Sequence, residues 1–164
     1  GAIIAAAGAA VAAYDEGQSL DAHAMRLARR LQRAGRLDGA ALGRMIGDGV
    51  LPLFIAGLAM LCGLDAAGTW EVLSDPEGRG PALLLRAARL PREDVAAILL
   101  SLNERGPLLS GAEGAAAAAQ LELYDTIDEA TAREILRLWQ ANPAYRASIA
   151  RLSTRSRASA AEAA

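Results

Sequence analysis

The chain has 164 residues, of which 17 are basic, 19 are acidic and one is histidine, and its formal net charge is −2. This length is typical of one domain that buries about two-thirds of the surface exposed by its unfolded form. The near balance of charge excludes a global field that would attract nucleic acid or anionic lipid. The single cysteine, Cys62, excludes an intramolecular disulfide and fits a reducing compartment, so we expect a cytoplasmic protein.

All basic residues are arginine, and alanine is the largest contributor to the hydrophobic fraction of 53%. Both features are typical of a GC-rich coding sequence, so the abundance of arginine does not by itself indicate phosphate binding. We expect a single helical domain over residues 1–153 and a flexible tail over 154–164. The first residue is Gly and not Met, which indicates a processed or cut N terminus.

Two helices are predicted before residue 35. Residues 2–14 form an apolar, alanine-rich stretch without the positively charged leader of a secretory signal, so we expect a packing helix there. Residues 20–34 predict a second helix, capped by Ser19 and ended by Gly35. Its apolar face repeats at spacings of four and three residues, and it consists of Leu20, Ala24, Leu27, Leu31 and Ala34.

Another side of the second helix carries four basic residues that we call the arginine strip: Arg26, Arg29, Arg30 and Arg33. Guanidinium groups on one face can bind an acidic partner helix or a phosphate backbone. The alternative is a solvated arginine face that salt bridges tie to acidic residues elsewhere in the fold. No aromatic residue accompanies the strip, and Trp70 and Trp139 both stand at core spacing, which weakens the nucleic-acid interpretation.

The central element is an uncharged, almost wholly apolar run over residues 50–62. A helix that is apolar all round lies in the middle of a core, so we predict a buried central helix. Asp48 or Gly49 can cap its start, Pro52 suits its first turn, and Gly63 can end it. A membrane span is the weaker interpretation, because this range rises only about 20 Å and a bilayer core is about 30 Å thick.

The remaining sequence predicts further short helices and no strand, because no stretch alternates with period two. The helices are expected over 40–46 with Asp38 as cap, from Asp65 to Leu73, over 82–89, from Pro91 to Leu102, over 114–125, from Thr126 to about Gln140, and over 143–152. Thr126 and Glu129 have the spacing of a capping box. We therefore predict an all-α domain of about nine short helices, whose successive pairs are compatible with a HEAT-like or irregular helical repeat.

Three features from residue 35 onward occur in a family-specific order. Residues 35–38 carry a Gly-x-Leu-(Thr/Asp) helix start, and Gly47 and Asp48 form a turn before the apolar helix that contains Phe54. Residues 84–91 correspond to a Leu-(x)-Arg-Ala-Gly-Leu-Pro pattern. In these features, over residues 35–91, the chain resembles the bacterial domain of unknown function 2336 family. It departs from the family at Ala88, where Gly is usual, and by an extra proline before Phe54.

The family resemblance implies an all-helical, HEAT-like fold in a bacterial cytoplasmic protein. It implies no activity, because none is assigned to the family, and it transfers no functional residue to this chain. Longer relatives are usual in the family, which agrees with a cut N terminus.

No constellation of residues predicts catalysis, a metal or a cofactor. His23 and Asp21 stand two apart on a helix and do not face each other, so we expect a surface histidine. Cys62 lacks a neighbouring base and is expected to be inert core. We expect structural roles for the acidic residues. Asp75 and Glu77 would lie in a solvated turn, and helix capping would explain Asp125, Asp128 and Glu129. The glycines of residues 47–49 lack the spacing of a phosphate loop.

These observations favour a non-catalytic protein-interaction or scaffold module. It would bind a protein partner through the arginine strip (Arg26, Arg29, Arg30 and Arg33) or through a groove between short helices, with no cofactor and no membrane. Homo-oligomers are compatible with the alanine-rich helices. Two alternatives stay open: nucleic-acid binding by the same strip, and an enzyme whose site the sequence does not reveal.

Overall fold

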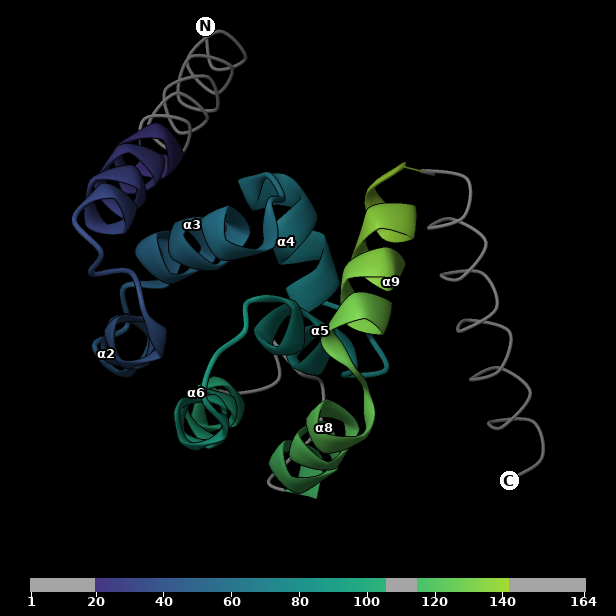
Figure 1. Ribbon diagram of the computed structural model, residues 1–164. Coiled ribbons are helices and arrows are strands. Elements are labelled where there is room, and N and C mark those ends of the chain that lie inside the picture. Colours follow the sequence, from purple (N-terminus) through teal and green to yellow (C-terminus); the bar gives the residue numbers. More distant parts are fainter. Residues whose placement is uncertain (1–19, 106–114, 142–164) are drawn as a thin grey trace, which may run out of the picture.

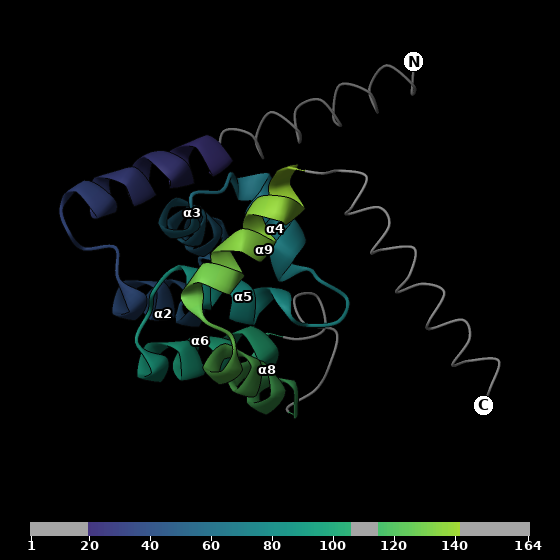
Figure 2. The ribbon, with the colours of Figure 1, turned by 45° about the vertical axis from the view of Figure 1, so that its right-hand side comes forward.

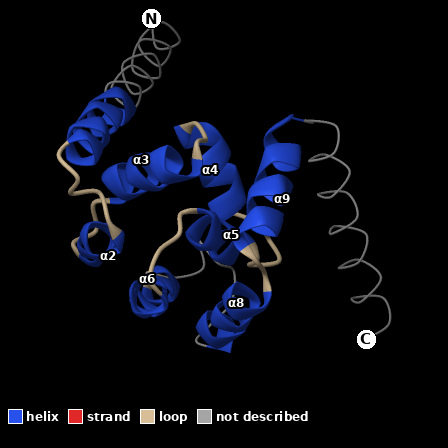
Figure 3. Ribbon diagram, viewed as in Figure 1, coloured by secondary structure: helices blue, strands red, loops and turns tan. Residues whose placement is uncertain are grey.

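A computed structural model describes residues 20–105 and 115–141. All regular structure in these residues is helical, as Figure 3 shows, and no strand occurs among them. A helical segment at 20–33 is followed by seven α-helices, so the predicted all-α class is confirmed. These eight helices belong to the described residues, whereas the predicted count of about nine was made for the whole chain. The helices predicted over 2–14 and 143–152, and the tail over 154–164, lie outside the described residues.

The seven labelled helices follow one another with short connections. They are α2 (Gly39–Gly47), α3 (Leu51–Cys62), α4 (Ala66–Leu73), α5 (Gly80–Ala87), α6 (Arg92–Glu104), α8 (Ala115–Thr126) and α9 (Glu129–Ala141). Helix α5 packs against α3, α4, α8 and α9, while α6 returns to lie beside α2 (Figure 1). Segment 20–33 and α9 therefore cover different sides of a core built by α2 to α8 (Figure 2).

Helix α3 is a core helix as predicted, but α5 is more completely buried. In α3, Phe54 and Leu58 are fully buried, whereas Pro52 is exposed and Ile55 only half-buried. In α5 every residue except Arg86 is buried. The reason is length and position: α5 is short, has one polar side chain, and is enclosed by helices that come before and after it in the chain.

The start of α5 approaches the end of α4 so closely that only glycine fits there. A Cβ atom added at Gly80 would lie 1.6 Å from the carbonyl oxygen of Val72. Any side chain at this position would therefore push α4 and α5 apart. Gly80 thus fixes the angle at which the chain enters its most buried helix.

Three predicted helix ends agree with the structure and two do not. Neither Asp48 nor Gly49 caps the start of α3, because Asp48 follows the end of α2 and the N-cap of α3 is Val50, which makes no side-chain hydrogen bond. The Asp38 carboxylate accepts from the amide of Ala41 at 2.8 Å, and Asp65 caps α4 in the same manner. Gly63 ends α3 in the left-handed conformation, with φ of 69°. The capping box at 126–129 is wrong: α8 continues through Thr126, and Asp128 caps α9 instead by accepting from the amide of Thr131 at 2.7 Å.

The left-handed backbone position before Leu90 and Pro91 belongs to Arg89, whose φ is 58°. Ala88, the residue predicted to replace the family glycine, has an ordinary helical φ of −75°. Arg89, and not Ala88, is therefore the residue of this turn whose backbone favours glycine. Its left-handed conformation costs a non-glycine residue about 1 kcal/mol.

Segment 20–33 packs on α3 through small side chains. Ala24 and Ala28 meet Ala56, with Met25 and Leu53 alongside. The predicted apolar face is partly wrong, because Leu20 is 60% exposed and Ala34 is exposed, while the unpredicted Ala28 is fully buried. Alanines four residues apart let the two helices approach closely, and this turns the contact face of the segment toward positions 24 and 28.

The core stripes of the later helices follow their predicted spacing. All four predicted positions of α6 are buried, namely Val95, Ile98, Leu99 and Leu102. Ala132 and Leu136 of α9 are buried, and Ile135 and Trp139 pack half-buried beside them.

No single helix in the described ranges is both long and apolar enough to cross a membrane. Only α3 and α4 taken together, bent by 101°, meet those criteria of length and composition.

Candidate functional site

The arginine strip lies on the outward side of segment 20–33. Because an α-helix has 3.6 residues per turn, the four positions of the strip fall within a sector of about 100°. Ala24 and Ala28, which are buried against α3, point to the opposite side. Arg26, Arg29, Arg30 and Arg33 are accordingly all exposed, as the sequence predicted.

None of the four strip guanidinium groups forms an ion pair with a described residue, although Asp21 lies on the same helix. The predicted alternative, a face tied down by salt bridges from elsewhere in the fold, therefore has no support within residues 20–105 and 115–141. Arg26 and Arg30 stand one turn apart with like charge, which is unfavourable by about 0.2–0.5 kcal/mol per pair. A negatively charged partner would relieve that repulsion.

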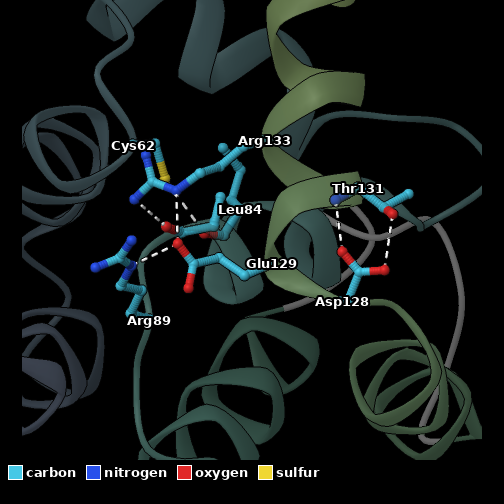
Figure 4. A network of polar contacts seen from close by, with 8 residues as sticks. Cys62, Leu84, Arg89, Asp128, Glu129, Thr131 and Arg133 are labelled. Atoms are coloured by element: carbon cyan, nitrogen blue, oxygen red, sulfur yellow. Dashed lines mark hydrogen bonds and ion pairs between the residues drawn. The ribbon is translucent and has the colours of Figure 1, made fainter.

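Most of the described arginines beyond α3 behave differently, because acidic side chains pair with them. Helix α9 is held to the end of α5 by a polar network (Figure 4). The Glu129 carboxylate accepts from the Nε atoms of both Arg89 and Arg133, at 3.0 Å in the second case. Arg133 also donates from Nη2 to the carbonyl oxygen of Ala87 at 2.8 Å. Sequence reasoning missed this network, since it assigned Glu129 to helix capping.

Cys62 lies at the edge of the same network and is half-buried. Its Sγ donates to the carbonyl oxygen of Leu84 at 3.2 Å (Figure 4). Burial raises the pKa of the Cys62 thiol to about 12, and the positive charge of Arg133 opposes this only in part. The thiol is thus protonated at neutral pH, and a protonated thiol is not a nucleophile.

The acidic residues singled out from the sequence are distributed over separate structural roles. Asp75 is not solvated as predicted but 3% exposed, because the turn before α5 wraps around it. Its carboxylate accepts from the backbone amide of Arg79 at 3.1 Å. Asp125 does not cap a helix but forms two hydrogen bonds of 2.9 Å with Arg92, while Asp128 is a cap as predicted.

The described residues hold no candidate metal site, and His23 lies at the surface. Among the residues that the structure describes, no group of three or more His, Cys, Asp or Glu side chains could hold a metal ion. His23 is exposed at the surface, as predicted. The acidic residues singled out from the sequence, from Asp75 to Glu129, are therefore explained by a cap, a turn and ion pairs.

A second surface feature was not predicted, because Trp70 was assigned to the core. Trp70 is 40% exposed, while Trp139 packs against the core as expected. Trp70 lines an open pocket of about 270 Å³ between segment 20–33, α3 and α4, which we call the Trp70 pocket. Its lining residues are Asp21, Pro52, Ile55, Ala56, Ala66, Ala67 and Trp70.

The helical period of α4 explains why Trp70 is exposed. Thr69, Val72 and Leu73 form the buried face of this eight-residue helix. Trp70 stands about 100° around the helix from Thr69, so it leaves the core face. The spacing along α4 places Trp70 and Thr69 in different sectors of the helix. It does not tell which sector faces the core, so the sequence alone could not predict that Trp70 is exposed.

Comparison with known proteins bears on the resemblance stated from residues 35–91. A family model described as an uncharacterised protein conserved in bacteria (DUF2336) matches residues 1–137. No curated protein and no solved structure matches the chain. The family match covers well over half of the chain and includes all the motifs on which the resemblance rests. The chain therefore belongs to the domain of unknown function 2336 family of bacteria.

Proposed function

We propose that this domain is a non-catalytic docking module whose arginine strip binds an acidic helical segment of a partner protein. The observation that carries the proposal is the unpaired state of the strip. Four exposed guanidinium groups share one helix face, and no described residue neutralises them. Guanidinium groups pair with carboxylates through two parallel hydrogen bonds, which makes acidic side chains their natural ligands.

The length of the strip favours a helical segment as the ligand. From Arg26 to Arg33 the helix rises about 10 Å, which is two turns. A partner helix that carries acidic residues at spacings of three, four and seven would present its carboxylates over the same distance. Such a contact also removes the like-charge repulsion within the strip.

The charge of the surrounding molecule disfavours a long polyanion. Residues 50–141 contain seven arginines and thirteen acidic residues, so nucleic acid that extended beyond the strip would meet an acidic surface. No aromatic residue lies on the outward face of segment 20–33 to stack on a base. Nucleic-acid binding is therefore the second candidate, and the experiment below separates the two.

The non-catalytic part of the proposal is supported by the state of the reactive side chains. The Cys62 thiol is protonated at neutral pH and donates to a backbone carbonyl. His23 is exposed and has no hydrogen bond to a described residue that would orient it as a base. General acid–base or nucleophilic catalysis needs such an orienting partner.

The test is a titration with a labelled helical peptide that carries Glu at positions i, i+4 and i+7. We would compare the wild-type protein with the double variant Arg26→Glu/Arg30→Glu in buffer of physiological ionic strength. The matched control is Arg36→Glu/Arg44→Glu, which makes the same change in charge at exposed arginines outside the strip. The strip variant should bind at least about tenfold more weakly, and the control should bind as wild type does.

Two controls decide between ligand classes. A peptide with Gln in place of Glu should bind much more weakly, because its amide oxygens are uncharged and do not neutralise the guanidinium groups. A single-stranded oligonucleotide that bound more tightly than the Glu peptide, and lost affinity in the strip variant, would move the assignment to nucleic acid. Equal binding of the Glu peptide to the strip variant and the control variant would overturn the docking role of the strip.

A further inference from the structure

We propose that the Trp70 pocket is a second docking site, which binds a cationic amphipathic segment of a partner protein. In this site an apolar side chain of the partner enters the pocket, and an adjacent Arg or Lys pairs with Asp21 and lies over the indole of Trp70. The inference goes beyond the arginine strip, because the pocket has different residues and the opposite charge.

The size and lining of the pocket fit one or two side chains. Its volume of about 270 Å³ lies just below the range of about 300–1,000 Å³ that is typical of small-molecule sites. Pro52, Ile55, Ala66 and Ala67 give it apolar walls from two helices. Leu20, 60% exposed, lies next to the lining residue Asp21 on segment 20–33.

Trp70 is the lining residue whose contact with a partner should contribute most to binding. Tryptophan combines a large apolar surface with one N–H donor, and it is enriched at the energetic centres of protein interfaces. Trp70 is 40% exposed, and its indole forms no hydrogen bond with any residue of the described ranges. A partner side chain that covered the indole would remove apolar surface from water and fill the pocket.

The charge around the pocket selects a cationic partner. Among the described lining residues Asp21 alone is charged, and no ion pair joins it to another described residue. Asp65 and Glu71 flank the lining residues of α4, and no basic residue occurs between positions 50 and 75. Asp21 is five residues before Arg26, the first residue of the strip, and the strip projects from a different sector of the helix.

An aromatic face beside a carboxylate is a well-matched environment for a cation. Tryptophan is the best aromatic partner for a guanidinium or ammonium group within about 6 Å. Asp21 would neutralise the same group at the rim of the pocket. A partner segment with an apolar residue next to Arg or Lys therefore meets apolar walls, an aromatic face and a carboxylate at once.

The test follows the indole N–H resonance of Trp70 during titration with a helical peptide of Leu and Lys residues. This resonance is assigned by its loss in Trp70→Phe, and the Trp139 indole serves as an internal reference. We expect a saturable shift at Trp70 and none at Trp139. The affinity should fall about fivefold or more in Asp21→Asn and about tenfold in Trp70→Ala, whereas Asp48→Asn, which removes an exposed carboxylate elsewhere, should bind as wild type does.

Each alternative outcome has a distinct signature. A Leu–Glu peptide that bound as well as the Leu–Lys peptide would overturn the charge selection, and the absence of a saturable Trp70 shift would overturn the site. A Trp70 shift on simple dilution, without peptide, would replace the partner segment by a second copy of this chain. Because Arg26→Glu/Arg30→Glu leaves the lining intact, failure of the strip and failure of the pocket can be told apart.

Discussion

Residues 20–49 and residues 79–137 use arginine in opposite ways. The first region holds six arginines and three aspartates, and none of the six guanidinium groups has a polar partner among the described residues. In the second region all seven arginines are engaged: five pair with carboxylates, Arg105 donates to the carbonyl of Gly47, and Arg86 lies 4.7 Å from the ring centre of Tyr124.

Arginines that join helices occur in the second region, whereas the arginines of the first region face solvent. Arg89, Arg92 and Arg133 connect helices that are distant in sequence. Segment 20–33, in contrast, packs on α3 through alanines and neighbouring apolar side chains such as Met25, and its cations take no part in that contact. Arginines of the second region therefore connect helices, and those of the first stay exposed without a described partner, as the proposed docking role requires.

The largest expected effect compares the two hydrophobic clusters beneath these regions. Leu84→Ala removes a fully buried side chain from α5 and should lower the free energy of unfolding by about 2–5 kcal/mol. Met25→Ala removes a half-buried side chain from the small cluster under segment 20–33. Its cost should be clearly smaller, because less apolar surface returns to water. Urea denaturation of both variants measures the difference, and equal costs would contradict the division into a main and a minor cluster.

The arginine comparison itself is tested by one substitution in each region. Arg133→Gln loses the hydrogen bonds to Glu129 and to the carbonyl of Ala87, so it should destabilise the fold by about 1 kcal/mol. Arg30→Gln changes an exposed side chain without a described partner and should stay within about 0.5 kcal/mol of wild type. Thermal unfolding of both proteins provides the measurement. A strip variant as unstable as Arg133→Gln would mean that the strip has a structural role.

A smaller effect is expected at the end of α5. Arg89→Gly removes a non-glycine residue from a left-handed conformation but also loses an exposed ion pair to Glu129. The two changes oppose each other, so stability should change by less than about 1 kcal/mol. Ala88→Gly, at an ordinary helical φ, should instead destabilise by about 0.5–1 kcal/mol. The reverse order would contradict the left-handed conformation of Arg89.

The smallest effects concern the stability of the fold at acidic pH. Hydrogen bonds from Arg92 lower the pKa of Asp125, and hydrogen bonds from Thr131 and from Arg89 lower the pKa values of Asp128 and Glu129. A carboxyl whose pKa is lower in the folded protein stabilises the fold above its unfolded pKa. That stabilisation is lost as pH falls from about 4 through the folded value. Asp125→Asn should therefore lose stability at pH 7 and show a weaker dependence between pH 4 and 2.

The acid experiment has a control in the first region. Asp48→Asn removes an exposed carboxylate without a described ion pair, so its acid dependence should match that of wild type. Denaturant titrations at several pH values give both curves. An Asp125→Asn curve that is parallel to wild type would show that the pair with Arg92 adds nothing measurable.

Local features of the sequence predicted the helices and the orientation of the strip. Helix ends follow from side chains near in sequence, so Asp38, Asp65 and Gly63 were placed correctly. The four strip arginines share a face because helical periodicity depends only on spacing. The family, too, was recognised from motifs within residues 35–91 and is confirmed over 1–137.

Features that depend on long-range packing were missed or misplaced. Trp70 was assigned to the core, Asp75 to solvent, and Glu129 to a helix cap, because the neighbours of these side chains come from other helices or from the path of a turn. The close contact at Gly80 and the left-handed backbone at Arg89 likewise result from how α4, α5 and α9 meet. Spacing along the chain determines which residues share a helix face. Only the tertiary structure decides whether that face meets another helix or water, since that depends on contacts between residues far apart in sequence.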